Sequence, residues 1–306
     1  MSTTIVNETS ALEVVEGTSV STSENGLFEK ALCAAIKLPG IKIDRASFLK
    51  KELSKRFDGE VVKKAIETNP AQAGISVKEL EKIAAACINY ETTKVSALSA
   101  AAGVGGFKVM AATIPLDFAQ FFGHVIRILQ KLVYLYGWQE IFCGKKDTLD
   151  ELDSETMNQL ILFIGVMFGV KAAVGAINKV AAAAAVQVPN ALLRQALTKG
   201  AIYPIVKKIA QAIGVNMTKA IFAKGVGKAI PVVGAVASGG ITLALFLPMA
   251  KRLQKHLISL PMASVDFYQT PHDNEIVDLD FSDIIVESIA VDEIDLFDDS
   301  IFDNIS

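Results

Sequence analysis

The 306-residue chain has few of the residues from which disulfide frameworks, metal sites and catalytic centres are usually built. It contains three histidines and three cysteines, Cys33, Cys87 and Cys143, and no CxxC pair. This excludes a disulfide scaffold and a cysteine-based zinc module and is typical of a reduced, intracellular protein. Aromatic residues make up 7% of the chain and hydrophobic residues 51%, so the apolar side chains are mostly Ala, Val, Ile and Leu. We expect no metal ion and no cofactor.

Motifs of the common enzyme classes are also missing from the sequence. There is no His-Glu-x-x-His, no Gly-x-Ser-x-Gly and no Gly-x-x-x-x-Gly-Lys-Ser/Thr. Gly227-Lys228 is followed by Ala229, which has no hydroxyl to bind the magnesium ion of a nucleotide. The sequence therefore predicts a protein without enzymatic activity, and it indicates no catalytic residue.

The net charge of −3 is distributed unevenly along the chain. Residues 1–30 carry −4, residues 31–256 carry +14, and residues 257–306 carry −13 with no Lys or Arg. A basic, apolar body between acidic ends favours an anionic partner such as a lipid surface, although a solvated surface with a solubilising tail would have the same charges. Nucleic acid is not expected, because the basic residues are scattered among Ala-rich helices without base-stacking aromatic residues.

The spacing of apolar residues predicts an all-α fold, a multi-helix bundle of Ala/Gly-rich amphipathic and apolar helices. Ser76 and Glu79 form a capping box at the start of one long helix. We divide the chain into a disordered, Ser/Thr-rich segment 1–26, a helical body 27–258 and an acidic-hydrophobic tail 259–306. Helices are expected near residues 27–37, 44–57, 59–68, 77–101, 114–136, 154–186, 190–199, 204–223 and 229–258.

Two apolar segments approach the length of a membrane span. Residues 229–250 include 22 positions without a charge, and about 20 suffice to cross a bilayer. Pro231 and Pro248 argue against a straight span, so a shallow hairpin or a buried helix are alternatives. The residues expected to face the membrane, with their basic flanks, are Lys228, Ile230, Val232, Val233, Leu243, Leu245, Phe246, Leu247, Lys251 and Arg252.

The second apolar segment lies in the helix expected at 154–186. Residues 156–170 are uncharged, a length that fits a buried helix better than a span. Gly165, Gly169 and Ala173 follow a small-xxx-small pattern, which allows two helix backbones to approach closely. We expect these three residues to lie at a helix-packing interface.

The helix that begins near Asp117 is apolar around most of its circumference and polar along one stripe. The stripe residues are three or four positions apart and so share one face: Asp117, Gln120, His124, Arg127 and Lys131, extended by Tyr134. The stripe could be the solvated face of the helix. It could also bind an anion or a lipid head group, or line a cavity of a lipid-binding or hydrolytic protein. The third alternative is an internal salt-bridge network.

Several of these motifs resemble the bacterial EcsC protein family. They are the Ala/Gly run from Ser96 to Phe107, the sequence Ile114-Pro-Leu-Asp117 with Tyr136-Gly-Trp138, and the run from Ile230 to Gly240 followed by a basic segment that ends at His256. The resemblance covers about residues 45–258. It implies a bacterial, membrane-associated, non-catalytic helical protein with a link to transporter or secretion function, and it supplies no site residues.

Acidic residues alternate with large apolar residues in the C-terminal tail, where Phe281, Leu296, Phe297 and Phe302 are the candidate contact residues. Such alternation is typical of a disordered segment that folds onto a basic, apolar groove. The groove would belong to a partner or to the body of the same chain. In the second case the tail competes with an anionic membrane for the body.

Together these features predict a non-enzymatic interaction protein on the cytoplasmic side of the inner membrane. Its basic body would contact anionic lipid or a membrane protein, peripherally or by shallow insertion. An integral protein that spans the membrane at 229–250 is the first alternative. A lipid-binding or hydrolytic protein with a cavity lined by the Asp117 to Lys131 stripe is the second.

Overall fold

The computed structural model describes residues 28, 30–104, 116–142, 154–186, 207, 210 and 231–270. Of this part of the chain 76% is helical, and it contains no strand, so the predicted all-α class is confirmed. Residues 30–36 are helical. The further elements are α2 (Arg45–Leu53), α3 (Gly59–Glu67), α4 (Val77–Val104), α5 (Leu116–Leu135), α6 (Ser154–Met167), α7 (Lys171–Ala185), α10 (Pro231–Ile258), the 3-10 turn η1 (Pro261–Ala263) and α11 (Val265–Gln269).

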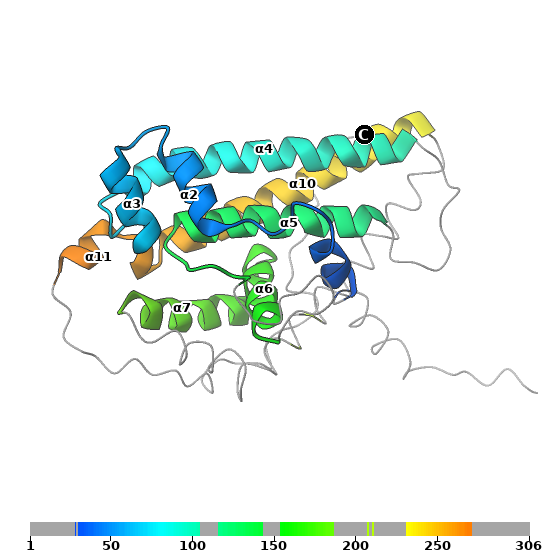
Figure 1. The fold of residues 1–306 in the computed structure, drawn as a ribbon. Helices are drawn as coiled ribbons and strands as arrows, with labels where there is room; N and C mark the ends of the chain where they lie inside the picture. The colour runs from blue at the N-terminus through cyan, green and yellow to red at the C-terminus, as the bar shows by residue number, and fades with distance from the viewer. Residues whose placement is uncertain are drawn as a thin grey trace, which may run out of the picture.

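Three long helices form the centre of the fold. α4 and α5 lie side by side and run in opposite directions, and α10 packs against both of them (Figure 1). The Ser76 hydroxyl accepts a hydrogen bond from the Glu79 backbone N–H at 3.4 Å, which confirms the predicted start of α4. The apolar face of α10 is buried at Phe246, Met249, Ala250, Leu253 and Leu257. These positions follow helical spacing, so one side of α10 faces the core.

The prediction of a single helix at 154–186 is wrong, because the structure has two helices there, α6 and α7. The chain turns at Gly169, whose φ of 80° is a left-handed conformation that favours glycine. Arg252 of α10 donates a hydrogen bond from Nη1 to the Met167 carbonyl at 2.7 Å and so satisfies a carbonyl at the end of α6. Gly165, Gly169 and Ala173 therefore do not share one helix face, because they belong to α6, the turn and α7 respectively.

A buried arginine holds α2 and α3 in place. Arg45 is 6% exposed, and its guanidinium donates to the carbonyls of Ile66 at 2.8 Å and Thr68 at 3.0 Å, at the end of α3. Its Nε donates to the carbonyl of Trp138 at 2.9 Å. The Arg45 backbone N–H donates to a carboxylate oxygen of Glu140 at 2.7 Å, at the start of α2. One side chain thus ties the ends of both short helices to the segment after α5.

The folded body extends past the boundary expected at residue 258. Leu260, Met262 and Ala263 are buried, and Asn69 donates a hydrogen bond from its amide to the Tyr268 hydroxyl at 2.8 Å. Gly137 has a φ of 101°, and a Cβ there would lie 2.8 Å from the Met262 carbonyl oxygen. Residues 259–270 therefore belong to the body and not to the acidic tail.

Candidate functional site

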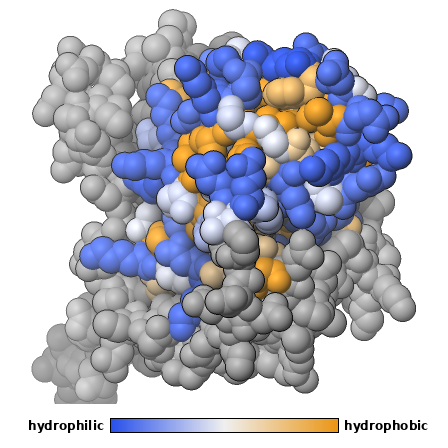
Figure 2. All heavy atoms as spheres, turned by 90° about the vertical axis from the view of Figure 1, so that its left-hand side faces the viewer, coloured by the Kyte–Doolittle hydropathy of each residue, from blue (hydrophilic) through white to orange (hydrophobic). Residues whose placement is uncertain are grey.

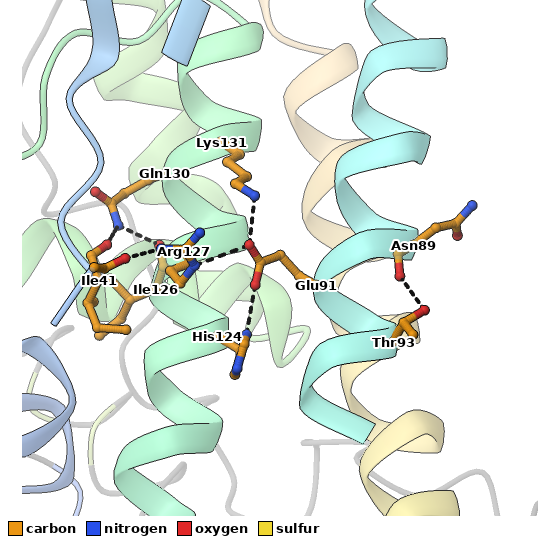
Figure 3. Close-up of polar contacts among 10 residues, drawn as sticks. Ile41, Asn89, Glu91, Thr93, His124, Ile126, Arg127, Gln130 and Lys131 are labelled. Atoms are coloured by element: carbon orange, nitrogen blue, oxygen red, sulfur yellow. Dashed lines mark hydrogen bonds and ion pairs between the residues drawn. The ribbon is translucent and has the colours of Figure 1, made fainter. Parts of the chain in front are cut away.

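The stripe predicted on α5 faces a single acidic residue of α4. Figure 3 shows His124, Arg127 and Lys131 directed from successive turns of α5 toward Glu91. The steps of three and four residues put these side chains on one face of α5, as the sequence predicted. Of the three alternatives for the stripe, the structure shows an internal salt-bridge network for these members.

The Glu91 cluster, as we call these four residues, occupies both carboxylate oxygens. Oε1 accepts from Arg127 Nε at 3.1 Å and from Lys131 Nζ at 2.6 Å, and Oε2 lies 2.7 Å from His124 Nδ1. An ionised carboxylate can only accept, so His124 donates from Nδ1. Glu91 is 0% exposed, whereas the side chains of its partners are 11–23% exposed.

The environment of Glu91 stabilises its ionised form. Burial by itself raises the pKa of this carboxyl group. The hydrogen bonds from His124 and Lys131 and the attraction to Lys131 and Arg127 outweigh burial and lower the pKa from 4.5 to about 2. The Glu91 carboxylate is therefore ionised at neutral pH and is bound by Arg127, Lys131 and His124. Such a cluster joins α4 to α5 through charge-assisted hydrogen bonds.

Arg127 of the stripe and the nearby Gln130 also bind the segment that precedes α2. Arg127 Nη1 donates to the carbonyl of Gly40. Gln130 Nε2 donates to the carbonyl of Ile41 at 2.8 Å (Figure 3). Its Oε1 accepts from the Ile43 N–H at 2.8 Å. α5 thereby supplies hydrogen bonds to a backbone segment that has no regular secondary structure.

The remaining stripe residues lie in different surroundings. The side chain of Asp117 lies outside the described residues, and Gln120 is half-buried. Tyr134 is fully buried and donates its hydroxyl to Glu140 at 2.7 Å. Burial, followed by the nearby negative charge of Glu140, raises the pKa of Tyr134. Tyr134 therefore belongs to the polar contacts around Arg45 and not to the Glu91 cluster.

The sequence reasoning missed Glu91, Gln130 and Arg45. Glu91 lies four residues after Cys87 and four before Val95, both of which are buried, so its position falls on the apolar face of α4. A charge on an apolar helix face requires a partner when it is buried. That spacing is the signal that could have indicated Glu91.

The candidate membrane-facing residues are only partly described. Phe246 is 0% exposed and its ring centroid lies 6.4 Å from that of Phe121, so it faces the core and not a membrane. Leu245 and Leu247 are half-buried, and Lys251 is exposed. Lys228 and Ile230, the side chains of Val232, Val233 and Leu243, and the tail residues Phe281, Leu296, Phe297 and Phe302 lie outside the described residues. In the part of the chain that the structure describes, no helix combines the length and the apolar character needed to cross a membrane.

A second charged feature lies at the end of the molecule formed by α2 and α3. We call residues 45–67 the basic hairpin: α2, the turn 54–58 and α3. Figure 2 shows this end, where hydrophilic side chains surround smaller apolar areas. Among its half-buried apolar side chains are Phe57, Val61 and Ile66. Its exposed cations are Lys50, Lys51, Lys55, Arg56, Lys63 and Lys64.

Two of the hairpin cations are paired within the body. Lys55 lies 2.5 Å from Glu52, and Arg56 lies 3.7 Å from Glu79. The other four form no ion pair with a described residue: Lys50, Lys51, Lys63 and Lys64. The basic hairpin therefore offers positive charge to an external anion, whereas the Glu91 cluster uses its own cations internally.

Comparisons of the chain with protein-family models, with curated proteins and with solved structures find no match. The EcsC resemblance therefore stays a prediction. The assignment of function depends on the two charged features described above.

Proposed function

We propose that this protein is a non-enzymatic, peripheral membrane-binding protein that recognises anionic lipid through its basic hairpin. The observation that supports this most directly is the set of four exposed lysines on α2 and α3 without an ion pair inside the described body. The Glu91 cluster is less suited to this role. Its carboxylate already binds the three basic groups that would have to contact a lipid phosphate.

The energetics require both charge and apolar contact. A lysine close to an anionic surface contributes about 1 kcal/mol, so four contribute about 4 kcal/mol. This corresponds to a dissociation constant of about 1 mM, which is weak binding. The half-buried side chains of Phe57, Val61 and Ile66 supply apolar surface between the lysines, and their insertion into the head-group region would strengthen the contact. Binding of this type is reversible and decreases with ionic strength.

The basic hairpin is the part of the body that we expect to contact lipid. The sequence alone did not identify which surface of the body does so. The partner is an anionic lipid, on the cytoplasmic side of the inner membrane. A link to a transporter or to secretion is the further expectation that comes from the EcsC resemblance alone. Of the three alternatives for the stripe, we retain the internal salt-bridge network, which stabilises the α4–α5 pair.

Flotation of the full-length protein with neutral and anionic vesicles tests the proposal. We expect flotation with anionic vesicles only, and its loss at high salt. A variant with Gln at the four unpaired hairpin lysines should not float. The control variant carries Gln at four other exposed lysines: Lys94, Lys171, Lys251 and Lys255. Equal flotation of the two variants would overturn the assignment to the basic hairpin, and absence of flotation with anionic vesicles would overturn the function.

Extraction of membranes with alkaline carbonate separates the peripheral protein from the alternative that spans at 229–250. A peripheral protein is released into the soluble fraction because the pH weakens its ionic contacts with lipid. An integral protein stays in the pellet. Retention in the pellet would contradict the proposed function.

A further inference from the structure

We propose that residues 271–306, the acidic tail of the same chain, dock on the basic hairpin. The inference deepens the proposed function, because it identifies what competes with lipid for this surface. Its test needs no membrane, so it can fail or succeed independently. Three observations support it: the place where the tail leaves the body, the charges of the two segments, and the apolar side chains among those charges.

The tail begins beside the hairpin. The last described residue is Thr270, and two positions before it Tyr268 accepts the hydrogen bond from Asn69 at 2.8 Å. Asn69 comes two residues after the end of α3. A segment that starts next to its binding surface needs little additional translational entropy loss to reach that surface, since the effective concentration of a tethered segment is in the millimolar range. Intramolecular docking therefore requires weaker contacts than binding of the same segment as a separate chain would.

The charges of the two segments are complementary. Residues 271–306 contain twelve Asp and Glu and no Lys or Arg. The hairpin has a net charge of +3, from seven basic and four acidic residues, and four of its six exposed cations lack an ion pair in the described body. The cations of the Glu91 cluster are already occupied by Glu91. The hairpin is thus the surface beside the start of the tail where additional carboxylates find free ammonium groups.

Apolar side chains are present on both segments. The hairpin has half-buried Phe57, Val61 and Ile66 among its lysines, and Figure 2 shows apolar areas between hydrophilic ones at this end of the molecule. In the tail, large apolar residues alternate with acids, as in Asp295-Leu-Phe-Asp298. A tail that served only to neutralise the charge of the hairpin would not need these large apolar residues. This pattern fits a docked segment whose acids reach the lysines while its apolar residues cover the exposed parts of the hairpin core.

Zero-length carbodiimide cross-linking of the full-length protein, without lipid, tests the docking. The reagent joins a carboxylate to an adjacent lysine, and peptide mass spectrometry identifies each pair. We expect cross-links from acids of 271–306 to Lys50, Lys51, Lys63 and Lys64. Raising the salt from about 0.1 M to about 1 M shortens the screening length from about 10 Å to about 3 Å, so these cross-links should fall at least about fivefold.

The control lysines are Lys94, Lys171, Lys251 and Lys255, which are exposed on other helices. Tail cross-links spread over all exposed lysines without preference would overturn the inference. Cross-links formed mainly between chains, seen when isotopically light and heavy proteins are mixed, would also overturn it. A full-length variant in which the twelve tail acids are replaced by their amides lacks the carboxylates that the reagent activates, so this variant is used for flotation and not for cross-linking.

Flotation of the same amide variant distinguishes the two proposals. If the tail competes with lipid, the amide variant floats with anionic vesicles more completely than the unmodified protein does. If hairpin cross-links form but neither protein floats, docking is supported and the lipid-binding function fails. If both proteins float equally and no hairpin cross-links form, the function is supported and docking fails.

Discussion

Replacement of Glu91 by Gln should destabilise the protein, although it changes only one non-hydrogen atom of the side chain. The amide removes the negative charge that His124, Arg127 and Lys131 approach within 3.1 Å. The three basic groups would then lie close together in a partly buried site without a counter-charge. Removal of one partner from a buried ion pair costs about 3–5 kcal/mol. Because the three basic side chains keep some contact with water, we expect a loss near the lower end, about 3 kcal/mol.

The pKa of Glu91 gives a second route to this magnitude. A change from the ordinary 4.5 to about 2 corresponds to about 3 kcal/mol in favour of the ionised, folded state. The pKa is lower in the folded chain than in the unfolded chain. The stabilisation is therefore complete above about pH 4.5 and is lost as the pH falls toward about 2. The difference in stability between the unmodified protein and Glu91→Gln should shrink over the same interval.

Urea unfolding followed by circular dichroism measures both effects. Glu81→Gln is the matched control, because Glu81 is exposed on the same helix and this change should alter the free energy of unfolding by less than about 0.5 kcal/mol. Equal unfolding free energies for Glu91→Gln and the unmodified protein at pH 7 would refute the reasoning. A difference that stays constant down to pH 2 would refute the assignment of the pH dependence to Glu91.

Two further predictions concern backbone geometry and thiol reactivity. Gly137→Ala should destabilise the protein by about 1–3 kcal/mol, because φ is 101° and the new Cβ would lie 2.8 Å from the Met262 carbonyl oxygen. Gly59→Ala, where the added Cβ meets nothing within 4 Å, should not destabilise it in the same thermal melt. Burial raises the pKa of the Cys87 thiol to about 11, so iodoacetamide at pH 8 should modify the exposed Cys33 first; faster labelling of Cys87 would contradict this.

The helical periodicity of the sequence predicted most of the described fold. The expected helices at 59–68, 77–101, 114–136 and 229–258 agree with α3, α4, α5 and α10 within a few residues. Helices expected at 190–199 and 204–223 lie outside the described residues, apart from residues 207 and 210. Periodicity is reliable here because each long helix has a continuous apolar face.

The two errors in the fold have a common physical cause. The break at Gly169 is stabilised by Arg252, which lies far along the chain, and a glycine within an apolar run does not by itself indicate a turn. The end of the body was placed too early because no Lys or Arg follows Lys255, although residues 259–270 contain only one acid, Asp266. In the structure, Met262 is buried and Tyr268 binds Asn69. Both features depend on tertiary contacts that local composition does not contain.

The same distinction applies to the candidate site. Periodicity correctly placed His124, Arg127 and Lys131 on one face of α5, but it could not tell whether that face meets water, a ligand or another helix. The deciding residue, Glu91, lies 33 to 40 positions earlier in the chain. Basic residues on a stripe and basic residues on an open surface look alike in a sequence. The difference lies in the structure: the basic residues of the stripe already bind an acid of the same chain, whereas those on an open surface do not.

This difference changes which experiment can reveal a ligand. Substitution of Arg127 and Lys131 by Ala would remove two of the three groups that bind Glu91 and leave a buried carboxylate with only His124. Loss of lipid binding in that variant would follow from a weakened α4–α5 contact even if neither residue touched lipid. Lys50 and Lys63 are exposed, and their replacement disrupts no ion pair in the described body. A change in binding on their substitution therefore reports on the ligand, and this makes the basic hairpin the better place to look for function.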